Sequence, residues 1–421
     1  MHAEISQPHS RTIREIIRRY YTVWAVYSLA GGFLFGVYPI FLQSRGLNQA
    51  QINSVLAAYL IVLFLTDVPT GAFADLLGRR RSFVLGAALR VAAFVLYFFA
   101  HRYVEFLVAE CIDGIGTTFG NGAIDAWGVD ALDDAGYDGL KDRLFSRIAQ
   151  LTTAGFMVSA LIGARVADID IAYPWLLGAA GYLISMVVGW AVMRDSRRHS
   201  AKPRLGEIAN QMRERVADGF RAGFGERTIL MLSAAGAITI AAWAPYWLEW
   251  PILFNGTFNI GVWIIGVLYC VLAIARMIGA EWSARIVANE WRRASMLAML
   301  TAGASAGLFA AGLLASRPVA SLTALFAMNF CTGAMQPLVQ SWFNERIDSS
   351  QRATLLSFSS TFQTLGGAIG LMFAGQIADS AGIPFEWLVA GMISLCAAPV
   401  YIAARTRAVA GAPAAAVNPA E

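Results

Sequence analysis

Four ionisable side chains stand inside apolar stretches of the chain, where a charge is costly. They are Asp67, Arg90, Glu110 and Asp113. Three acids around one arginine leave excess negative charge in a low dielectric, so at least one carboxyl should be able to bind and release a proton. That chemistry would couple the movement of a solute to a proton gradient. The alternative is a static cluster of ion pairs that holds three helices together.

Helix geometry predicts that these groups lie at a similar depth. Asp67 and Arg90 are equally far from the turn between their two stretches, roughly 17 Å at 1.5 Å per residue. Arg90 and Asp113 are equally far from the next turn, and Glu110 lies one helical turn outward of Asp113 on the same face. We therefore expect Asp67, Arg90 and Asp113 to lie at one depth near the middle of a bilayer.

The elements that must position them are membrane-spanning helices. The chain has 421 residues, of which 57% are hydrophobic and 14% charged, whereas a soluble domain has about 25% charged residues. Apolar runs of about 20 residues, each able to cross the hydrocarbon of a bilayer as a helix, recur along the chain. The predicted fold class is an all-α polytopic membrane protein with twelve transmembrane helices, at 21–41, 53–76, 83–100, 104–127, 148–166, 173–193, 229–249, 260–281, 294–315, 319–342, 354–377 and 385–403.

Charge placement predicts the orientation and the domain limits. Most of the 32 Lys and Arg residues fall on the side that holds both termini, which the positive-inside rule assigns to the cytoplasm. Residues 194–228 are charged and predict a cytoplasmic linker. It would separate an N-terminal six-helix half, 1–193, from a C-terminal half, 229–404. Residues 405–421 are rich in Ala and Pro and predict a disordered tail.

The two halves resemble each other in sequence. A pattern of small residues that begins at Gly155 and ends at Asp168 recurs about 210 residues later, from Gly366 to Asp379. The basic loop near Arg79 has a weaker echo at Arg292. Two six-helix pseudo-repeats of this kind are an architecture of transporters.

The loop between the second and third spans carries the most specific motif. Residues 71–81 read GAFADLLGRRR. This resembles the signature loop of the major facilitator superfamily, G-x-x-x-D-x-x-G-R-[RK]-[RK], at the place where that family carries it. The resemblance covers almost the whole chain and implies a secondary active transporter that alternates between inward-open and outward-open states.

The resemblance also implies roles for the loop residues. The glycines would permit a tight cytoplasmic turn, and Asp75 would sit against the N-terminal end of span eleven, where a helix dipole favours an anion. The arginines would pair with Asp125 or Asp130. These contacts would form a conformational latch, and the alternative is a basic loop that only fixes topology. The latch residues would be Gly71, Asp75, Gly78, Arg79, Arg80, Asp125 and Asp130.

Span four departs from the family pattern. Many members carry R-x-x-Q-G there, whereas this chain has Glu110-Cys111-Ile112-Asp113-Gly114. An acid thus replaces the arginine that those members use in coupling. Span five also lacks the proline typical of drug:proton antiporters, which weakens the likeness to that group.

Several side chains are candidates for substrate binding. Arg276 has no acid at matching depth, so it could bind an anionic group of the substrate; pairing with Glu281 or snorkelling toward the cytoplasm is the alternative. Aromatic residues at the outer end of span seven could line a cavity or mark the membrane interface, and amides could line the cavity or bond between helices. The candidates besides Arg276 are Asn121, Trp243, Tyr246, Asn329 and Gln336.

These observations predict proton-coupled export of a drug-like compound or metabolite. The alternatives are uptake of a small metabolite, including an anionic one, and, from another class, a non-transporting receptor or scaffold. The four histidines lie at ends and loops, so we expect neither an enzyme nor a metal site. No nucleotide-binding G-x-x-x-x-G-K-[ST] loop is present, so we expect no cofactor and a proton gradient as the energy source.

Expected partners are the small-molecule substrate, protons and membrane lipid, without nucleic acid. We expect a monomer in a plasma membrane, the inner membrane of a bacterium.

Overall fold

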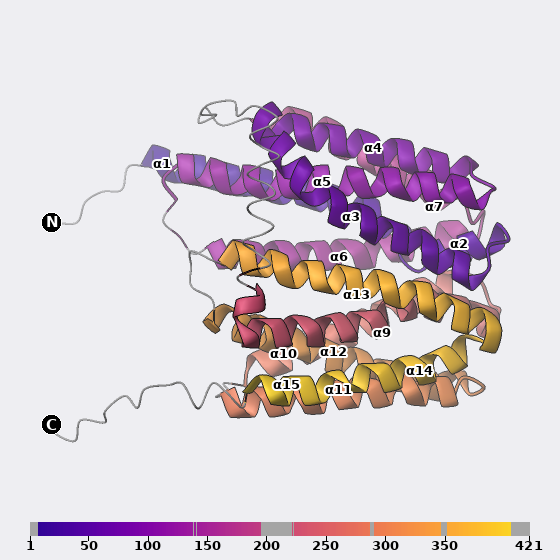
Figure 1. Cartoon of the computed structure of the whole chain (residues 1–421). Coiled ribbons are helices and arrows are strands. Elements are labelled where there is room, and N and C mark those ends of the chain that lie inside the picture. The colour runs from indigo at the N-terminus through magenta and orange to yellow at the C-terminus, as the bar shows by residue number, and fades with distance from the viewer. Residues whose placement is uncertain are drawn as a thin grey trace, which may run out of the picture. The chain divides into compact units, whose positions relative to one another are not determined.

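The computed structural model describes residues 7–137, 139, 141–194, 221, 223–286, 290–346 and 352–405. Every regular element in this part of the chain is an α-helix, as predicted (Figure 1). The helices are α1 (Gln7–Gly32), α2 (Val37–Ser44), α3 (Gln49–Leu77), α4 (Arg79–Phe99), α5 (Tyr103–Asp134), α6 (Lys141–Ala167), α7 (Tyr173–Val192), α9 (Arg227–Phe258), α10 (Trp263–Ala284), α11 (Glu290–Leu313), α12 (Pro318–Arg346), α13 (Arg352–Ala381), α14 (Ile383–Leu395) and α15 (Ala397–Arg405).

The helices account for the twelve predicted spans. Ten segments of the described residues are long and apolar enough to cross a membrane. Two of these segments combine consecutive helices: α1 with α2, across a turn at 33–36 where Gly36 has a φ of 83°, and α14 with α15. The other two spans are α5, of 32 residues, and α13, of 30. Both are long enough to cross a membrane, but their polar side chains make them less apolar than the other ten. In α5 these side chains include Glu110 and Asp113.

The chain forms two compact units that differ from the predicted halves. The first unit contains Met1–Met212 and Trp247–Cys270, and the second contains Arg213–Tyr246 and Val271–Glu421. The end of α9 and the start of α10 therefore belong with the first unit, although both follow the predicted linker. The division into 1–193 and 229–404 stays a prediction. Most of the linker at 194–228 and residues 406–421 of the predicted tail lie outside the described residues.

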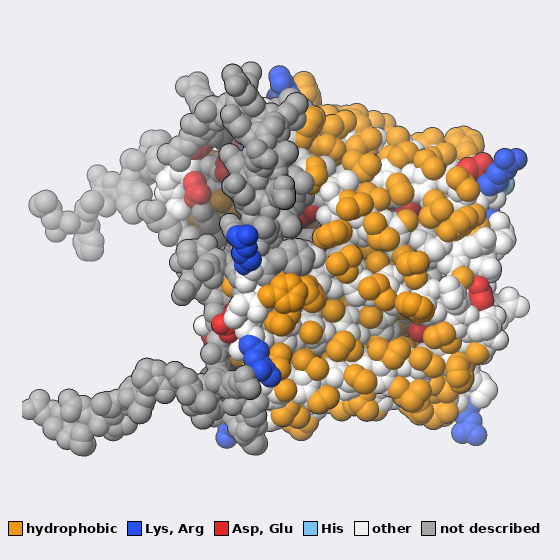
Figure 2. Space-filling model, viewed as in Figure 1, with side chains coloured by type: hydrophobic (Ala, Val, Ile, Leu, Met, Phe, Trp, Pro, Cys, Tyr) orange, Lys and Arg blue, Asp and Glu red, His pale blue; other side chains and the backbone are white. Residues whose placement is uncertain are grey.

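Apolar side chains cover the outer faces of the helices. Leu65, Phe99, Val319 and Phe373 are each at least 60% exposed. Figure 2 shows hydrophobic side chains over most of the visible helical surface, whereas Lys and Arg stand near its edges. Such a surface is unfavourable in water and favourable against lipid, where the helices satisfy their own backbone hydrogen bonds.

Glycines make close contacts with backbone in each of the two units. In the first unit, Gly163 of α6 lies directly against the backbone carbonyl of Phe33, which follows α1. In the second unit, Gly370 of α13 lies in the same way against the carbonyl of Ala241 in α9. Small residues let two helix backbones approach closely, so that van der Waals packing can hold them together where the hydrophobic effect does not act. Each unit thus contains such a close approach, although Gly163 and Gly370 are not matching positions of the sequence repeat.

Replacing Gly163 by alanine should lower the thermal stability of the purified protein. The added methyl group would overlap the carbonyl oxygen of Phe33, and backbone cannot swing away as a flexible side chain can. We expect a loss of about 1–3 kcal/mol, as for other overpacking changes. Gly122→Ala in α5 is the matched control, because no atom lies within 4 Å of the added methyl group. Equal melting temperatures for the two variants in detergent would contradict the packing argument.

Candidate functional site

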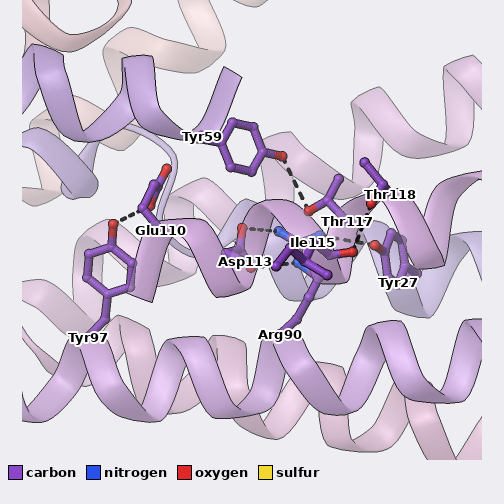
Figure 3. Close-up of polar contacts among 9 residues, drawn as sticks. All are labelled: Tyr27, Tyr59, Arg90, Tyr97, Glu110, Asp113, Ile115, Thr117 and Thr118. Atoms are coloured by element: carbon purple, nitrogen blue, oxygen red, sulfur yellow. Dashed lines mark hydrogen bonds and ion pairs between the residues drawn. The ribbon is translucent and has the colours of Figure 1, made fainter. Parts of the chain in front are cut away.

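Arg90 of α4 and Asp113 of α5 form a two-pronged ion pair inside the first unit. Nε of Arg90 donates to Oδ1 of Asp113 at 2.8 Å, and Nη2 donates to Oδ2 at 3.0 Å (Figure 3). The two side chains are only 12% and 10% exposed. Paired hydrogen bonds between a guanidinium and a carboxylate are strong and directional, so both charges are neutralised locally.

Glycines make room for this pair between the helices. α4 packs extensively on α5, and a methyl group on Gly116 would come within 2.7 Å of the Arg90 side chain. The guanidinium lies over the ring of Tyr182 at 4.1 Å and donates to the hydroxyl of Tyr27 at 3.2 Å. Arg90 is therefore held by one acid and two tyrosines, which come from α5, α1 and α7.

Glu110 lies one turn from Asp113 but has different partners. Its side chain is 6% exposed, and the Tyr97 hydroxyl of α4 donates to its Oε2. The hydroxyl of Tyr38 in α2 is 3.4 Å from that of Tyr97, and Trp175 stacks on the Tyr97 ring at 3.9 Å. Figure 3 shows the Glu110 carboxyl turned toward Tyr97, whereas Asp113 faces Arg90.

Asp67 does not join this group of side chains, and its shared depth with Arg90 and Asp113 in a bilayer stays a prediction. Its residue is exposed, and within the described part of the chain it makes no hydrogen bond or ion pair with Arg90, Glu110 or Asp113. The reason is the choice of neighbouring helix, because α3 packs mainly on α5 and little on α4. Equal distance from a turn fixed its depth but not its neighbours. The coupling roles proposed for the four residues stay predictions.

α3 instead contributes neutral hydroxyl groups to the site. The Tyr59 hydroxyl donates to Oγ1 of Thr117 at 3.3 Å, and the hydroxyls of Thr66 and Thr118 are 3.2 Å apart. These contacts join α3 to α5, and Thr117 lies one helical turn after Asp113.

The signature loop is organised around Gly78 and Arg79. Gly78, with a φ of 95°, separates α3 from α4. Gly71 lies inside α3, so it does not form the turn as expected. Arg79 pairs with Asp75 at 2.7 Å and with Asp130 of α5 at 3.5 Å. The ring of Trp190 in α7 lies 3.7 Å from the Arg80 guanidinium.

Asp125, the other expected partner of the motif arginines, is bound by α1. Its Oδ1 accepts hydrogen bonds from the Tyr20 hydroxyl at 2.6 Å and from the Trp24 indole at 3.0 Å. Of the two acids, Asp130 is therefore the partner of Arg79. The docking of Asp75 on span eleven and the latch role of the loop stay predictions.

In the second unit, three of the substrate-binding candidates lie together. Asn329 of α12 donates to the hydroxyl of Tyr246 in α9 at 2.9 Å, and both residues are 1% exposed. Arg276 of α10 interacts electrostatically with that hydroxyl. Arg276 is half-buried and has an interaction partner, so it is not a free cation; its role in substrate binding stays a prediction.

The remaining candidates are on α5, α9 and α12. Asn121 and Gln336 are exposed on α5 and α12, and Trp243 is 8% exposed in α9. No hydrogen bond or ring contact joins these three within the described residues. Their roles in substrate binding stay predictions.

The sequence reasoning missed the tyrosines around the buried charges. Tyr97 follows Arg90 by two helical turns, and Glu110 precedes Asp113 by one turn on the antiparallel neighbour. This spacing was a usable signal, because side chains three, four or seven residues apart share a helix face. Tyr27, Tyr38 and Tyr182 come from other helices, and no local pattern identifies them.

A double-mutant cycle on Arg90 and Asp113 should give a large coupling energy. Removing one partner leaves an uncompensated buried charge, so each of Arg90→Ala and Asp113→Ala should cost about 3–5 kcal/mol of unfolding free energy. The double variant should cost less than the sum of the two changes. Unfolding in detergent micelles, followed by tryptophan fluorescence, measures the effect.

The matched control is the exposed pair Arg285–Glu281, with an Nη2–Oε1 distance of 2.9 Å and side chains 76% and 66% exposed. Its coupling energy should be below about 1 kcal/mol. Similar coupling energies for the two pairs would contradict a buried, mutually neutralised Arg90–Asp113 pair.

Known proteins of similar sequence and structure carry solutes across membranes. The "Multidrug efflux pump Tap" of Mycobacterium tuberculosis is 23% identical over 380 residues, covering 87% of each chain. The "Multidrug resistance protein MdtH" of Aeromonas hydrophila is 25% identical over 341 residues, covering 77% of this chain and 79% of that protein.

Among solved structures, the nucleoside transporter NupG superposes with a TM-score of 0.73 at 14% identity, covering 93% of this chain and 99% of its own. A D-xylose–proton symporter superposes with a TM-score of 0.72 at 15% identity, covering 93% and 97%. Both likenesses show the fold alone. The model of the family described as Major Facilitator Superfamily matches residues 23–370 and 263–419. The chain therefore belongs to the major facilitator superfamily and is a multi-pass integral membrane transporter.

Proposed function

We propose that this transporter exports a drug-like compound or metabolite in exchange for protons, and that Glu110 is the proton-binding group. The observation that carries the proposal is an imbalance of charge: α4 and α5 bury two carboxyls beside one arginine, and that arginine is committed to Asp113. Glu110 is left with tyrosine hydroxyls as partners.

The physical argument concerns the cost of a buried anion. An ionised carboxyl without its own cation is unfavourable in an apolar interior, and the negative charge of Asp113 one turn away adds to that cost. Binding a proton removes the cost, and exposure to water restores a stable carboxylate. A conformational change that wets Glu110 on one side of the membrane would thus release its proton on that side.

Export is favoured over uptake by the names of the curated relatives. Tap and MdtH are both named for multidrug efflux or resistance, and this chain resembles each over most of its length. We further propose a monomer in a bacterial inner membrane with both termini in the cytoplasm, in accord with the distribution of basic residues.

Uptake of a small anionic metabolite is the second candidate. The observation in its favour is the group formed by Arg276, Tyr246 and Asn329 in the second unit. A carboxylate could compete for the guanidinium and accept from the Asn329 amide. A receptor or scaffold that does not transport would need neither this group nor the charges of α4 and α5.

Glu110→Gln should abolish proton-driven transport while sparing solute exchange. Glutamine keeps the shape of the side chain and an acceptor for the Tyr97 hydroxyl but cannot cycle a proton. With ethidium as the probe in proteoliposomes, we expect at least about a tenfold loss of uptake driven by a pH gradient. Exchange of internal for external ethidium, which needs no net proton movement, should persist.

Glu105→Gln is the matched control, because this acid lies on the same helix but at its exposed N-terminal end. It should leave both rates unchanged. Gradient-driven transport that survives in Glu110→Gln with its pH dependence intact would exclude Glu110 as the proton-binding group. Transport in neither the wild type nor any variant, across a panel of organic cations and anions, would favour the receptor.

A further inference from the structure

Asp168 directly follows α6 and binds the backbone where α10 begins. Its Oδ1 accepts hydrogen bonds from the backbone N–H groups of Val262 at 2.6 Å and Trp263 at 3.2 Å. Its Oδ2 accepts from Arg165 at 3.1 Å. Both carboxylate oxygens are therefore engaged, and the side chain is 20% exposed.

The start of α10 is shaped to receive this carboxylate. The first N–H groups of a helix have no partner within the helix, and the helix dipole favours an anion beside them. Gly261 precedes these residues with a φ of 109°, a conformation that glycine adopts without strain. A methyl group there would come within 2.9 Å of Asp168 Oδ1, so glycine also provides the space.

A small apolar contact lies beside the carboxylate. Val37 of α2, Ala164 and Ala167 are buried together, and Val262 packs against them. One turn further along α10, a methyl group on Gly266 would come within 2.9 Å of the Ala160 carbonyl and the Ala164 side chain. The contact thus combines a charged cap with close apolar packing.

The contact joins a helix of the first sequence repeat, α6, to a helix of the second, α10. By the predicted topology, the end of α6 and the start of α10 both face the outside. An alternating-access carrier must bring such ends together when it is closed to the outside and part them when it opens there.

We propose that the Asp168 carboxylate is an outer latch, a positioning group that holds α10 against α6 in the outward-closed state. The proposal rests on the alternating-access part of the proposed function and on neither proton coupling nor the substrate. A charged cap suits this task, because water can replace the carboxylate at the helix N-terminus when the contact opens. Gly163 of α6 packs on Phe33 without a charged cap among the described residues, so this contact can stay closed.

The test measures how often the outside contact opens. Val37 is fully buried beside the latch, so a cysteine at this position, Val37→Cys, should react with a membrane-impermeant maleimide only when the contact opens. Labelling of intact cells is compared with that of the same chain without Val37→Cys, which corrects for the four native cysteines. We expect slow labelling in the otherwise wild-type chain and about tenfold faster labelling after Asp168→Ala, the scale of a lost charged hydrogen bond.

Asp170→Ala is the matched control. It removes the same charge two residues later, but the Asp170 carboxylate accepts from the nearby N–H of Ala172, at 2.8 Å, rather than from α10. In the Val37→Cys background, its labelling rate should equal that of the protein with both Asp168 and Asp170 in place. Gly261→Ala should reproduce the effect of Asp168→Ala from the other side of the contact, and Asp168→Asn, which keeps one acceptor, should give an intermediate rate.

Two results would overturn the proposal. One is an unchanged labelling rate in both Asp168→Ala and Gly261→Ala, with melting temperatures that show folded protein. The other is that the Val37→Cys protein with Asp168 in place is not labelled over hours. The contact would then be a permanent structural link. Neither result depends on Glu110, so a failure of proton coupling and a failure of the latch are distinguishable.

Discussion

An arginine buried among apolar helices has to be neutralised where it stands, and the interior of the first unit is arranged around that requirement. Asp113 neutralises Arg90 through two hydrogen bonds, and the ring of Tyr182 and the hydroxyl of Tyr27 complete its surroundings. Such a group fits only because α4 and α5 approach through glycines, of which Gly116 lies against the arginine side chain itself. Close helix packing and charge neutralisation are therefore parts of one arrangement.

The same arrangement separates two acids that the sequence places one turn apart. Asp113 is the counter-ion of Arg90, and Glu110 lies among tyrosines. A carboxylate held by a guanidinium is stabilised as an anion, whereas one held by hydroxyl groups is accommodated with or without a proton. This difference in partners is the physical basis for assigning structure to Asp113 and proton exchange to Glu110.

Polar contacts at the helix ends contrast with the contacts between helix middles. Arg79 reaches Asp130 where α4 begins, and Asp168 reaches the start of α10 where α6 ends. Contacts of this kind can be exchanged for water at modest cost. Glycine contacts such as Gly163 on Phe33 gain nothing from water, so they suit interfaces that move as rigid bodies.

The sequence alone determined the helices, because an apolar run in lipid has no other way to satisfy its backbone. It also determined the level at which Arg90 and Asp113 lie, since the rise per residue is fixed. The signature loop identified the family, although only Gly78 of its two glycines forms the turn. These properties depend on residues close together in the chain.

Only the tertiary structure decided which groups at one level touch. α3 packs on α5 rather than α4, so Asp67 lies apart from Arg90. Asp125 accepts hydrogen bonds from Tyr20 and Trp24 of α1. Asp168 accepts hydrogen bonds from backbone N–H groups that lie 94 and 95 residues further along the chain. The rotation of each helix about its axis and its choice of neighbours come from packing against the whole bundle. No local pattern encodes them, because in lipid the packing of small residues, rather than the burial of an apolar face, selects the interface.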